Sequence, residues 1–195
     1  MIQYWLGIAT LTCIYLIAIL GVSILVGFTG LFSLGHAGFM AIGGYITALV
    51  VKMFGLPFFV SLIFGILAAM LVGGLIGKLT LNLKGDYFVI ATLAVGECTK
   101  LVIENLPEIT GGARGLTDIP KVTTFPIVFG ILVFVTILLV NFLHSKQGRN
   151  CIAIREEELA AQSVGINATG YKMRAFLISC ALCGLAGGLL AGYMG

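Results

Sequence analysis

The chain has 195 residues, of which 59% are hydrophobic and only 10% are charged, with eleven Lys or Arg against eight Asp or Glu. A soluble domain carries about 25% charged residues, and the mean hydropathy here is +1.13. This composition excludes a soluble globular domain, a disordered chain and a nucleic-acid-binding protein with a basic face. Lipid must be the solvent, and because one crossing takes about 20 apolar residues, the length allows about five to seven membrane helices.

The first apolar run carries no Lys or Arg and predicts a membrane helix over residues 5–26. The next ten residues, Gly27 to His36, hold three glycines, two hydroxyl side chains and a histidine without any charge. Non-helical backbone at membrane depth is tolerated only where protein or a water-filled cavity covers it. The pattern therefore predicts a broken segment near Ser33, followed by a second, short helix over residues 37–51.

Four further membrane helices are predicted, over residues 57–77, 86–106, 126–143 and 175–193. A loop rich in Gly and Pro precedes the fifth helix, and a long polar loop over residues 144–174 precedes the sixth. The prediction is an all-α, polytopic membrane bundle of about six helices that forms a single domain over residues 1–195. Because the chain stops within an apolar helix at Gly195, we expect the bundle to be incomplete at its C-terminus.

Basic residues are unevenly divided between the two sides of this bundle. The polar loop contains Lys146, Arg149, Arg155, Lys172 and Arg174. Cytoplasmic loops carry an excess of Lys and Arg, so this loop is predicted to be cytoplasmic, together with Lys78 and Lys84. Lys52, Arg114 and Lys121 then lie outside, as does the N-terminus.

Small residues recur at a spacing of four in two of the predicted helices. The positions are Gly65, Ala69, Gly73 and Gly77 in the third helix, and Gly184, Gly188 and Gly192 in the sixth. This spacing puts them on one face, where backbones approach closely. Packing within the chain is the favoured interpretation, and a homodimer face is the alternative. The cysteines, including the Cys180–Cys183 pair, are interpreted as buried packing residues.

The predicted fourth helix places Glu97, Lys100 and Glu104 inside an otherwise apolar span. An acid near the bilayer middle costs a few kcal/mol, so Glu97 should face the bundle interior. The spacings of three and four would allow Lys100 to pair with both acids. Two interpretations stay open, a structural ladder of ion pairs and a lining of a translocation path.

His36 lies at the end of the broken segment with no second histidine or cysteine at metal-ligand spacing, so no metal site is predicted. Its ring nitrogens are expected to bond nearby backbone groups, and binding of substrate or a proton is the alternative. The break as a whole is the better candidate site, because free backbone N–H and C=O groups at depth suit a polar or zwitterionic substrate. The candidate residues for a substrate path, if one runs here, are Ser33, Gly35, His36 and Glu97.

Within the polar loop, residues 155–165 predict a short helix. Three acids stand in its first turn, where the helix dipole favours them, and Gly165 suits the position after its end. Asn167 is placed to cap the helix that follows. The helix could lie on the bilayer, but anionic headgroups would repel its acids, so we expect it to enter a groove in a partner protein.

Several of these segments resemble known motifs. The segment Glu158-Leu159-Ala160-Ala161-x-x-x-Gly165 resembles the E-A-A-x-x-x-G coupling loop of bacterial ABC importer permeases. The run from Gly27 to Ala37 resembles the G-Y-x-G-Q-x-S-L-G-H-A segment of branched-chain amino acid permease subunits. Further similarity to that family lies in Gly85-Asp86-Tyr87-Phe88, in Thr92-Leu93 with Gly96-Glu97, and in Thr110-Gly111-Gly112.

The resemblance implies a permease subunit in a bacterial inner membrane, without enzymatic activity or a cofactor of its own. It implies four partners: a second permease subunit, two ATP-binding subunits that supply the energy, and an extracytoplasmic substrate-binding protein. The residues implied to contact the ATPases are Arg155, Glu156, Glu157, Glu158, Ala160, Ala161 and Gly165. Glu158 departs from the general motif by standing one position early, with Leu159 in the usual place of Glu.

Other functions stay open at this point. Related permeases carry urea, short amides or sugars, and nothing in the residues excludes such a substrate. An energy-independent transporter or channel that uses Glu97 and Lys100 is a second alternative, and a truncated subunit that only binds other subunits is a third. Gly77-Lys78 is followed by Leu79 and does not complete a phosphate-binding loop, so ATP hydrolysis requires partner subunits.

Overall fold

The computed structural model describes residues 2–81, 83, 85–112, 115–116 and 119–195, and within them the chain forms helices and no strand. Lys84 and Arg114, used above to orient the chain, lie outside the described residues. The elements are α1 (Ile2–Ser23), the π-helix η1 (Ile24–Phe28), α2 (His36–Phe54), α3 (Phe58–Thr80), α4 (Asp86–Glu104), α5 (Pro107–Thr110), α6 (Phe125–His144), α7 (Lys146–Glu156), α8 (Glu158–Ser163) and α9 (Ala168–Met194).

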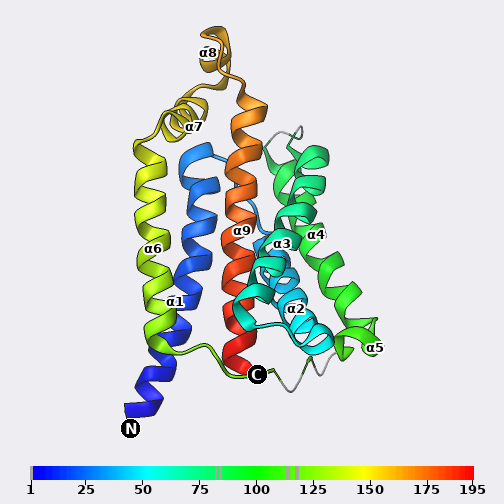
Figure 1. The fold of residues 1–195 in the computed structure, drawn as a ribbon. Coiled ribbons are helices and arrows are strands. Elements are labelled where there is room, and N and C mark those ends of the chain that lie inside the picture. The colour runs from blue at the N-terminus through cyan, green and yellow to red at the C-terminus, as the bar shows by residue number, and fades with distance from the viewer. Residues whose placement is uncertain (1, 82, 84, 113–114, 117–118) are drawn as a thin grey trace.

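The predicted all-α membrane bundle is confirmed. Five helical spans are long and apolar enough to cross a membrane: Gln3–Phe28, α2, α3, α6 and α9. The predicted fourth membrane helix is α4, which has the expected position but is not one of these five. Its central and C-terminal charges, Glu97, Lys100 and Glu104, make it more polar than the others. Figure 1 nevertheless shows α4 running between the two ends of the bundle, beside α2.

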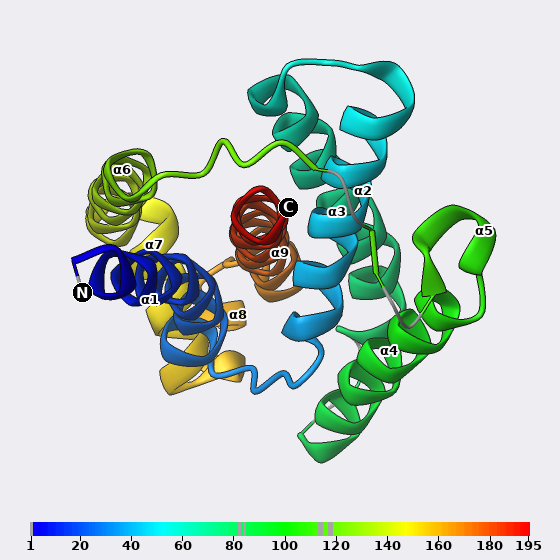
Figure 2. The same ribbon diagram turned by 90° about the horizontal axis from the view of Figure 1, so that it is seen from below.

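Helix α9 lies at the centre of the bundle. Figure 2 shows α1 and α6 on one side of it, α2 and α3 on the other, and α4 at the outer edge. In the most apolar 18-residue stretch of each helix, 61% of the α9 stretch is buried but only 17% of the α6 stretch. The outer helices therefore expose broad apolar surfaces, as expected of side chains that face lipid.

Glycines bring α2, α3 and α9 into close contact. A Cβ built on Gly43 would overlap the Gly184 backbone, and one on Gly184 would lie 2.7 Å from the Ala69 Cβ. A Cβ on Gly187 would overlap the carbonyl oxygen of Met40. The predicted small-residue faces of the third and sixth helices thus meet each other inside the chain, as expected for small residues at membrane-helix interfaces.

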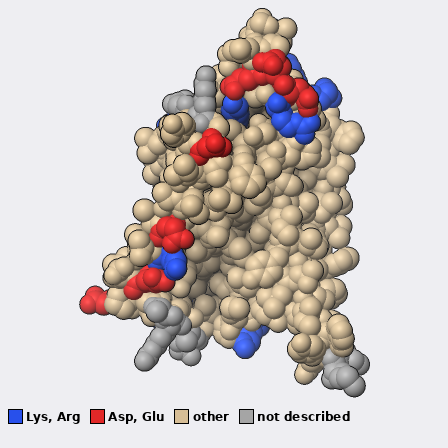
Figure 3. Space-filling view, turned by 180° about the vertical axis from the view of Figure 1, so that it is seen from behind, with Lys and Arg blue, Asp and Glu red and all other residues tan. Residues whose placement is uncertain are grey.

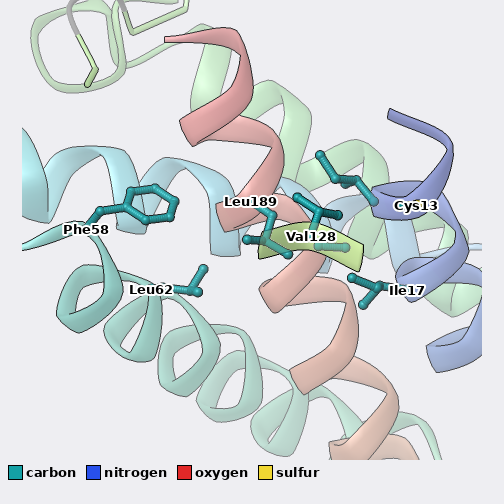
Figure 4. Packing of buried hydrophobic residues seen from close by; sticks show 8 residues of the cluster. Cys13, Ile17, Phe58, Leu62, Val128 and Leu189 are labelled. Carbon is teal, nitrogen blue, oxygen red and sulfur yellow. The ribbon is translucent and has the colours of Figure 1, made fainter. Parts of the chain in front are cut away.

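A buried apolar cluster joins both sides of the bundle through α9. It contains Cys13 and Ile17 of α1, Phe58 and Leu62 of α3, and Val128 of α6, with Leu189 of α9 among them (Figure 4). The other described clusters lie nearer the α7–α8 end and contain Cys151, Cys180 and Cys183. Four of the five cysteines are buried, in agreement with their predicted packing role, and Cys98 is exposed.

The predicted break near Ser33 is confirmed. Helix α1 ends in the wider turns of η1, where the Thr29 hydroxyl donates a hydrogen bond of 2.6 Å to the Leu25 carbonyl. Gly30 then turns the chain with φ +69°, a conformation that glycine adopts without a Cβ penalty. In Figure 1 the chain between η1 and α2 descends from the α7–α8 end to the start of α2, partway along the bundle.

The predicted single helix over residues 155–165 is wrong. The chain forms two helices, α7 and α8, separated by Glu157 in an extended conformation with φ −154° and ψ 105°. This extended residue redirects the chain so that α8 packs back against the start of α9. At the far end of α8 the prediction holds, because Gly165 has φ +84° and donates to the Gln162 carbonyl in a helix-terminating motif.

The predicted cap of the last membrane helix is confirmed. The Asn167 side chain accepts a hydrogen bond of 3.0 Å from the Gly170 N–H, and α9 begins at the next residue, Ala168. The helical stretch predicted after Asn167 and the membrane helix predicted over residues 175–193 thus form one continuous helix. Both chain ends lie at the side of the bundle opposite α7 and α8 (Figure 1).

Candidate functional site

The broken segment is attached to α4 at its second end. The Leu34 N–H donates to the Thr92 hydroxyl at 3.2 Å, and this hydroxyl in turn donates to the Val89 carbonyl. A Cβ on Gly35 would overlap the Thr92 carbonyl oxygen, so a glycine is required there. Thr92 was not among the predicted site residues, although it stands in one of the motifs that carry the family resemblance.

A groove with a volume of about 330 Å³ runs between α2 and α4 beside this attachment. Its walls come from the end of the broken segment, from one face of α2 and from the polar face of α4. Lining residues include Leu34, Gly38, Tyr45, Gly96, Glu97 and Lys100. The close approach of Gly38 and Gly96, with a Cβ on Gly38 at 3.0 Å from the Gly96 Cα, sets the depth of the groove.

The prediction that Glu97 faces the bundle interior is wrong. Its side chain is exposed on the outer side of the chain, in the groove, together with those of Lys100 and Glu104. The reason is that α4 lies at the edge of the bundle and packs mainly on α2, so none of the described helices packs against its polar face. An exposed row of charges is costly against hydrocarbon, and this face therefore requires water or another protein.

The alternative of an ion-pair ladder on α4 is not realised. In the described part of the chain the ion pairs are Arg155–Glu156 and Lys172–Glu158, and neither involves α4. Figure 3 shows charged side chains gathered at the α7–α8 end and in a patch over the α4 edge, with mostly uncharged surface between. None of the three charged groups of the groove forms an ion pair with another described residue.

A buried hydrogen-bond chain connects three helices behind the groove. His36 Nε2 lies 2.7 Å from the Ser179 hydroxyl, which donates to the Gly21 carbonyl at 2.6 Å. Because the only hydroxyl proton of Ser179 goes to Gly21, His36 must donate through Nε2–H. Through Nε2, His36 thus bonds a side chain of α9, which the sequence did not suggest. His36 Nδ1 and Ser33 Oγ are buried without a hydrogen-bond partner among the described residues.

We expect Ser179→Ala to destabilise the chain by about 1–3 kcal/mol, because it leaves the buried His36 Nε2–H without an acceptor. Thermal unfolding of the purified chain in detergent measures the effect. Thr136→Ala is the matched control, since the exposed Thr136 hydroxyl bonds only the carbonyl one turn earlier in α6. Equal unfolding temperatures for the two variants would contradict the assigned hydrogen-bond chain.

The four residues of the predicted substrate path divide between the groove and the buried region beside it. Glu97 lines the groove, whereas Ser33, Gly35 and His36 are buried beside it, Gly35 against α4 and His36 against α9. Ser179 belongs to this buried group and was missed. A hydroxyl within the apolar run of the last helix was its only signal in the sequence.

The predicted coupling residues divide into two sets. Arg155 and Glu158 face the rest of the chain, where Arg155 Nη1 donates to the Gly27 carbonyl at 2.6 Å and the Lys172 ammonium bonds Glu158 at 2.7 Å. Ala161 is buried with Ile154 and Ala168 in a small apolar cluster. The remaining predicted residues, Glu156, Glu157, Ala160 and Gly165, are exposed.

Two apolar side chains stand out at this end of the molecule. Leu159 and Val164 are each 75% exposed, on and directly after α8, which projects beyond the bundle in Figure 1. The sequence prediction omitted both, because Leu159 was noted only as a departure from the family motif. Because α8 projects beyond the bundle, these two side chains are accessible to a partner protein.

Metal and redox chemistry find no support in the described residues. No group of three or more His, Cys, Asp or Glu side chains there could hold a metal ion. On α7, burial raises the pKa of the Cys151 thiol, which disfavours the reactive thiolate. Cys151 is therefore a packing residue.

A helical bundle with five candidate spans, a broken segment and a charged groove among its described residues defines the chain as a multi-pass membrane protein. The particular family follows from comparison: the chain belongs to the family described as the permease component of branched-chain amino acid transport systems, whose model matches residues 4–195. The resemblance predicted from the motifs is confirmed.

Two curated relatives are similar over almost the whole chain. Both are high-affinity branched-chain amino acid transport system permease proteins LivM, one from Salmonella typhimurium and one from Escherichia coli. Each is 36% identical over 222 residues, and the match covers 96% of this chain but 52% of the relative. The chain thus spans about half the length of the curated relatives it matches. No solved structure gives a significant match.

Proposed function

We propose that the chain is a permease subunit of an ABC importer that moves branched-chain amino acids into the cytoplasm across a bacterial inner membrane. The observation that carries the proposal is the family match over residues 4–195. The projecting α8 with its exposed Leu159 and Val164 supports the proposal. A permease whose energy is supplied by separate ATP-binding subunits needs a surface on which those subunits dock. Residues 1–195 form the permease domain, and residues 144–174 its cytoplasmic coupling loop.

The energy comes from two ATP-binding partner subunits, because the chain has no phosphate-binding loop of its own. The chain therefore acts as a transport subunit and not as an enzyme, and ATP is used only by the partners. A second permease subunit covers the exposed charges of α4, which otherwise would face lipid at high cost. An extracytoplasmic binding protein delivers the substrate at the end opposite α7 and α8.

The groove between α2 and α4 is proposed to line the substrate path. It offers a carboxylate at Glu97 and an ammonium at Lys100, one for each charge of an amino acid zwitterion. Beside it, α2 and α4 form a second, mostly apolar hollow lined by Ile42, Ile46, Val95 and Val102, among others. A zwitterion with an aliphatic side chain suits these neighbouring surfaces better than urea or a sugar does.

We expect Glu97→Gln to lower uptake about tenfold or more without loss of the assembled complex, because the substrate ammonium loses a charged partner worth about 1.5–3 kcal/mol. Uptake of radiolabelled leucine into vesicles with the complete importer measures it. The control Glu108→Gln changes another exposed acid, on α5, that does not line the groove. Unchanged uptake by the Glu97 variant would exclude it from the path.

Competition identifies the substrate class. Unlabelled isoleucine and valine should suppress leucine uptake, whereas urea, acetamide and ribose in the same excess should not. Suppression by urea or by the sugar, with no effect of valine, would favour one of the other permease classes and contradict the proposed substrate.

A further inference from the structure

Arg155 reaches from the last turn of α7 to the end of the first membrane span. Its Nη1 donates to the Gly27 carbonyl at 2.6 Å, across 128 positions of sequence. The carbonyls in the last turn of a helix have no partner within the helix, and a cation is favoured there by the helix dipole. Arg155 thus supplies from α7 a bond that η1 itself cannot make.

The same side chain also packs against the turn that opens the broken segment. A Cβ on Gly30 would lie 3.0 Å from the Arg155 Cγ, so the aliphatic part of Arg155 lies directly over Gly30. Glu156 holds the other side of the guanidinium by accepting from Nε at 3.1 Å and also from Nη2. With 42% of the Arg155 side chain exposed, this ion pair adds little stability. Its effect is to fix where the guanidinium points.

The far end of the broken segment is fixed separately. The Leu34 N–H is held by Thr92, and Gly35 lies against the backbone of α4. The segment over residues 29–35 is therefore attached at two points, to α7 through Arg155 and to α4 through Thr92. Leu34, at the second point, lines the groove.

We propose that Arg155 is a positioning residue that connects the docking unit α7–α8 to the broken segment and, through it, to the groove. The proposal deepens the proposed function and rests on it. A partner bound to Leu159 and Val164 shifts α7 and α8, and Arg155 carries this shift to Gly27 and Gly30. Arg155 thus acts through its contacts inside the permease.

The test uses Arg155→Met in the assembled importer, because Met keeps much of the aliphatic length and removes the donors. ATP hydrolysis and leucine uptake are measured in the same proteoliposomes. We expect the ATPase subunits to stay bound and to hydrolyse ATP, while uptake per ATP hydrolysed falls about tenfold, in the range of typical coupling between sites. Arg155→Lys keeps one donor, so its uptake per ATP hydrolysed should lie between the wild-type value and that of Arg155→Met. If Arg155→Met assembles poorly, the Lys variant alone tests the proposal.

Arg149→Met is the matched control. Arg149 lies on the same helix and also donates to a backbone carbonyl, that of His144 at 2.7 Å, but this carbonyl ends α6 and not η1. The Arg149→Met variant should keep the wild-type ratio of leucine uptake to ATP hydrolysis. A wild-type ratio in both Arg155 variants would overturn the proposal and leave the proposed function standing. If the wild-type chain neither retains ATPases nor supports uptake, both the proposed function and the proposed role of Arg155 are refuted.

Discussion

Leu159→Asp combined with Val164→Asp is expected to abolish binding of the ATPase subunits. Both side chains are 75% exposed at the projecting end of the molecule, so neither substitution disturbs the packing of the chain itself. A carboxylate forced into an apolar pocket of the partner costs about 2 kcal/mol or more, which weakens binding about 30-fold for each substitution. Copurification of the ATPases with the tagged chain from detergent extracts measures the result.

Two controls accompany this experiment. Leu159→Met keeps an apolar side chain of similar volume and should retain the ATPases at the wild-type level. Size-exclusion profiles and thermal unfolding of the double Asp variant alone should match those of the wild-type chain. Retention of the ATPases by a folded double Asp variant would show that they dock elsewhere.

Gly187→Ala is expected to have the largest effect on stability. A Cβ there would lie against the backbone carbonyl of Met40, which cannot move without shifting α2 as a whole. Overpacking of this kind costs about 3 kcal/mol or more, which corresponds to a fall in the unfolding temperature of about 6–12 °C for a chain of this size. Thermal unfolding in detergent, followed by loss of the monodisperse peak, measures it.

The same substitution in α6 provides the comparison. A Cβ on Gly130 would meet nothing within 4 Å. Replacing a helix-interior glycine by alanine favours the helix by about 1 kcal/mol, so Gly130→Ala should unfold at the wild-type temperature or slightly above it. An unfolding temperature for Gly187→Ala as high as that of Gly130→Ala would contradict the close packing of α2 on α9.

Local patterns predicted much of the fold. The apolar runs gave the membrane helices to within a few residues, apart from the start of α9, and the uncharged Gly-rich stretch from Gly27 to His36 gave the break. Gly165 and Asn167 were assigned correctly because a helix end and a helix cap depend on the residue and its nearest neighbours.

Features that depend on distant partners could not be predicted in this way. The extended Glu157 separates α7 from α8 in an arrangement where Glu158 meets Lys172, fourteen positions later. The bond from His36 to Ser179 joins residues 143 positions apart, and the bond from Arg155 to Gly27 spans 128. None of these pairs leaves a periodic signal in a single sequence.

The position of Glu97 was mispredicted for a related reason. The cost of a charge in hydrocarbon indicates that the charge must be shielded from lipid. It does not indicate which part of the protein or which partner shields it. A bundle interior and a second subunit satisfy the same requirement. The edge position of α4 in Figure 2 shows that no described helix covers this charge, so water or another protein must do so.

The ATP dependence of leucine uptake tests the central claim most directly. Proteoliposomes are prepared with the complete importer that contains this chain, and in parallel with the chain alone, each with ATP or with a non-hydrolysable analogue inside. We predict leucine accumulation only with the complete importer and hydrolysable ATP. Leucine or proton flux through the chain alone, without ATP, would contradict the account and identify an energy-independent transporter or channel.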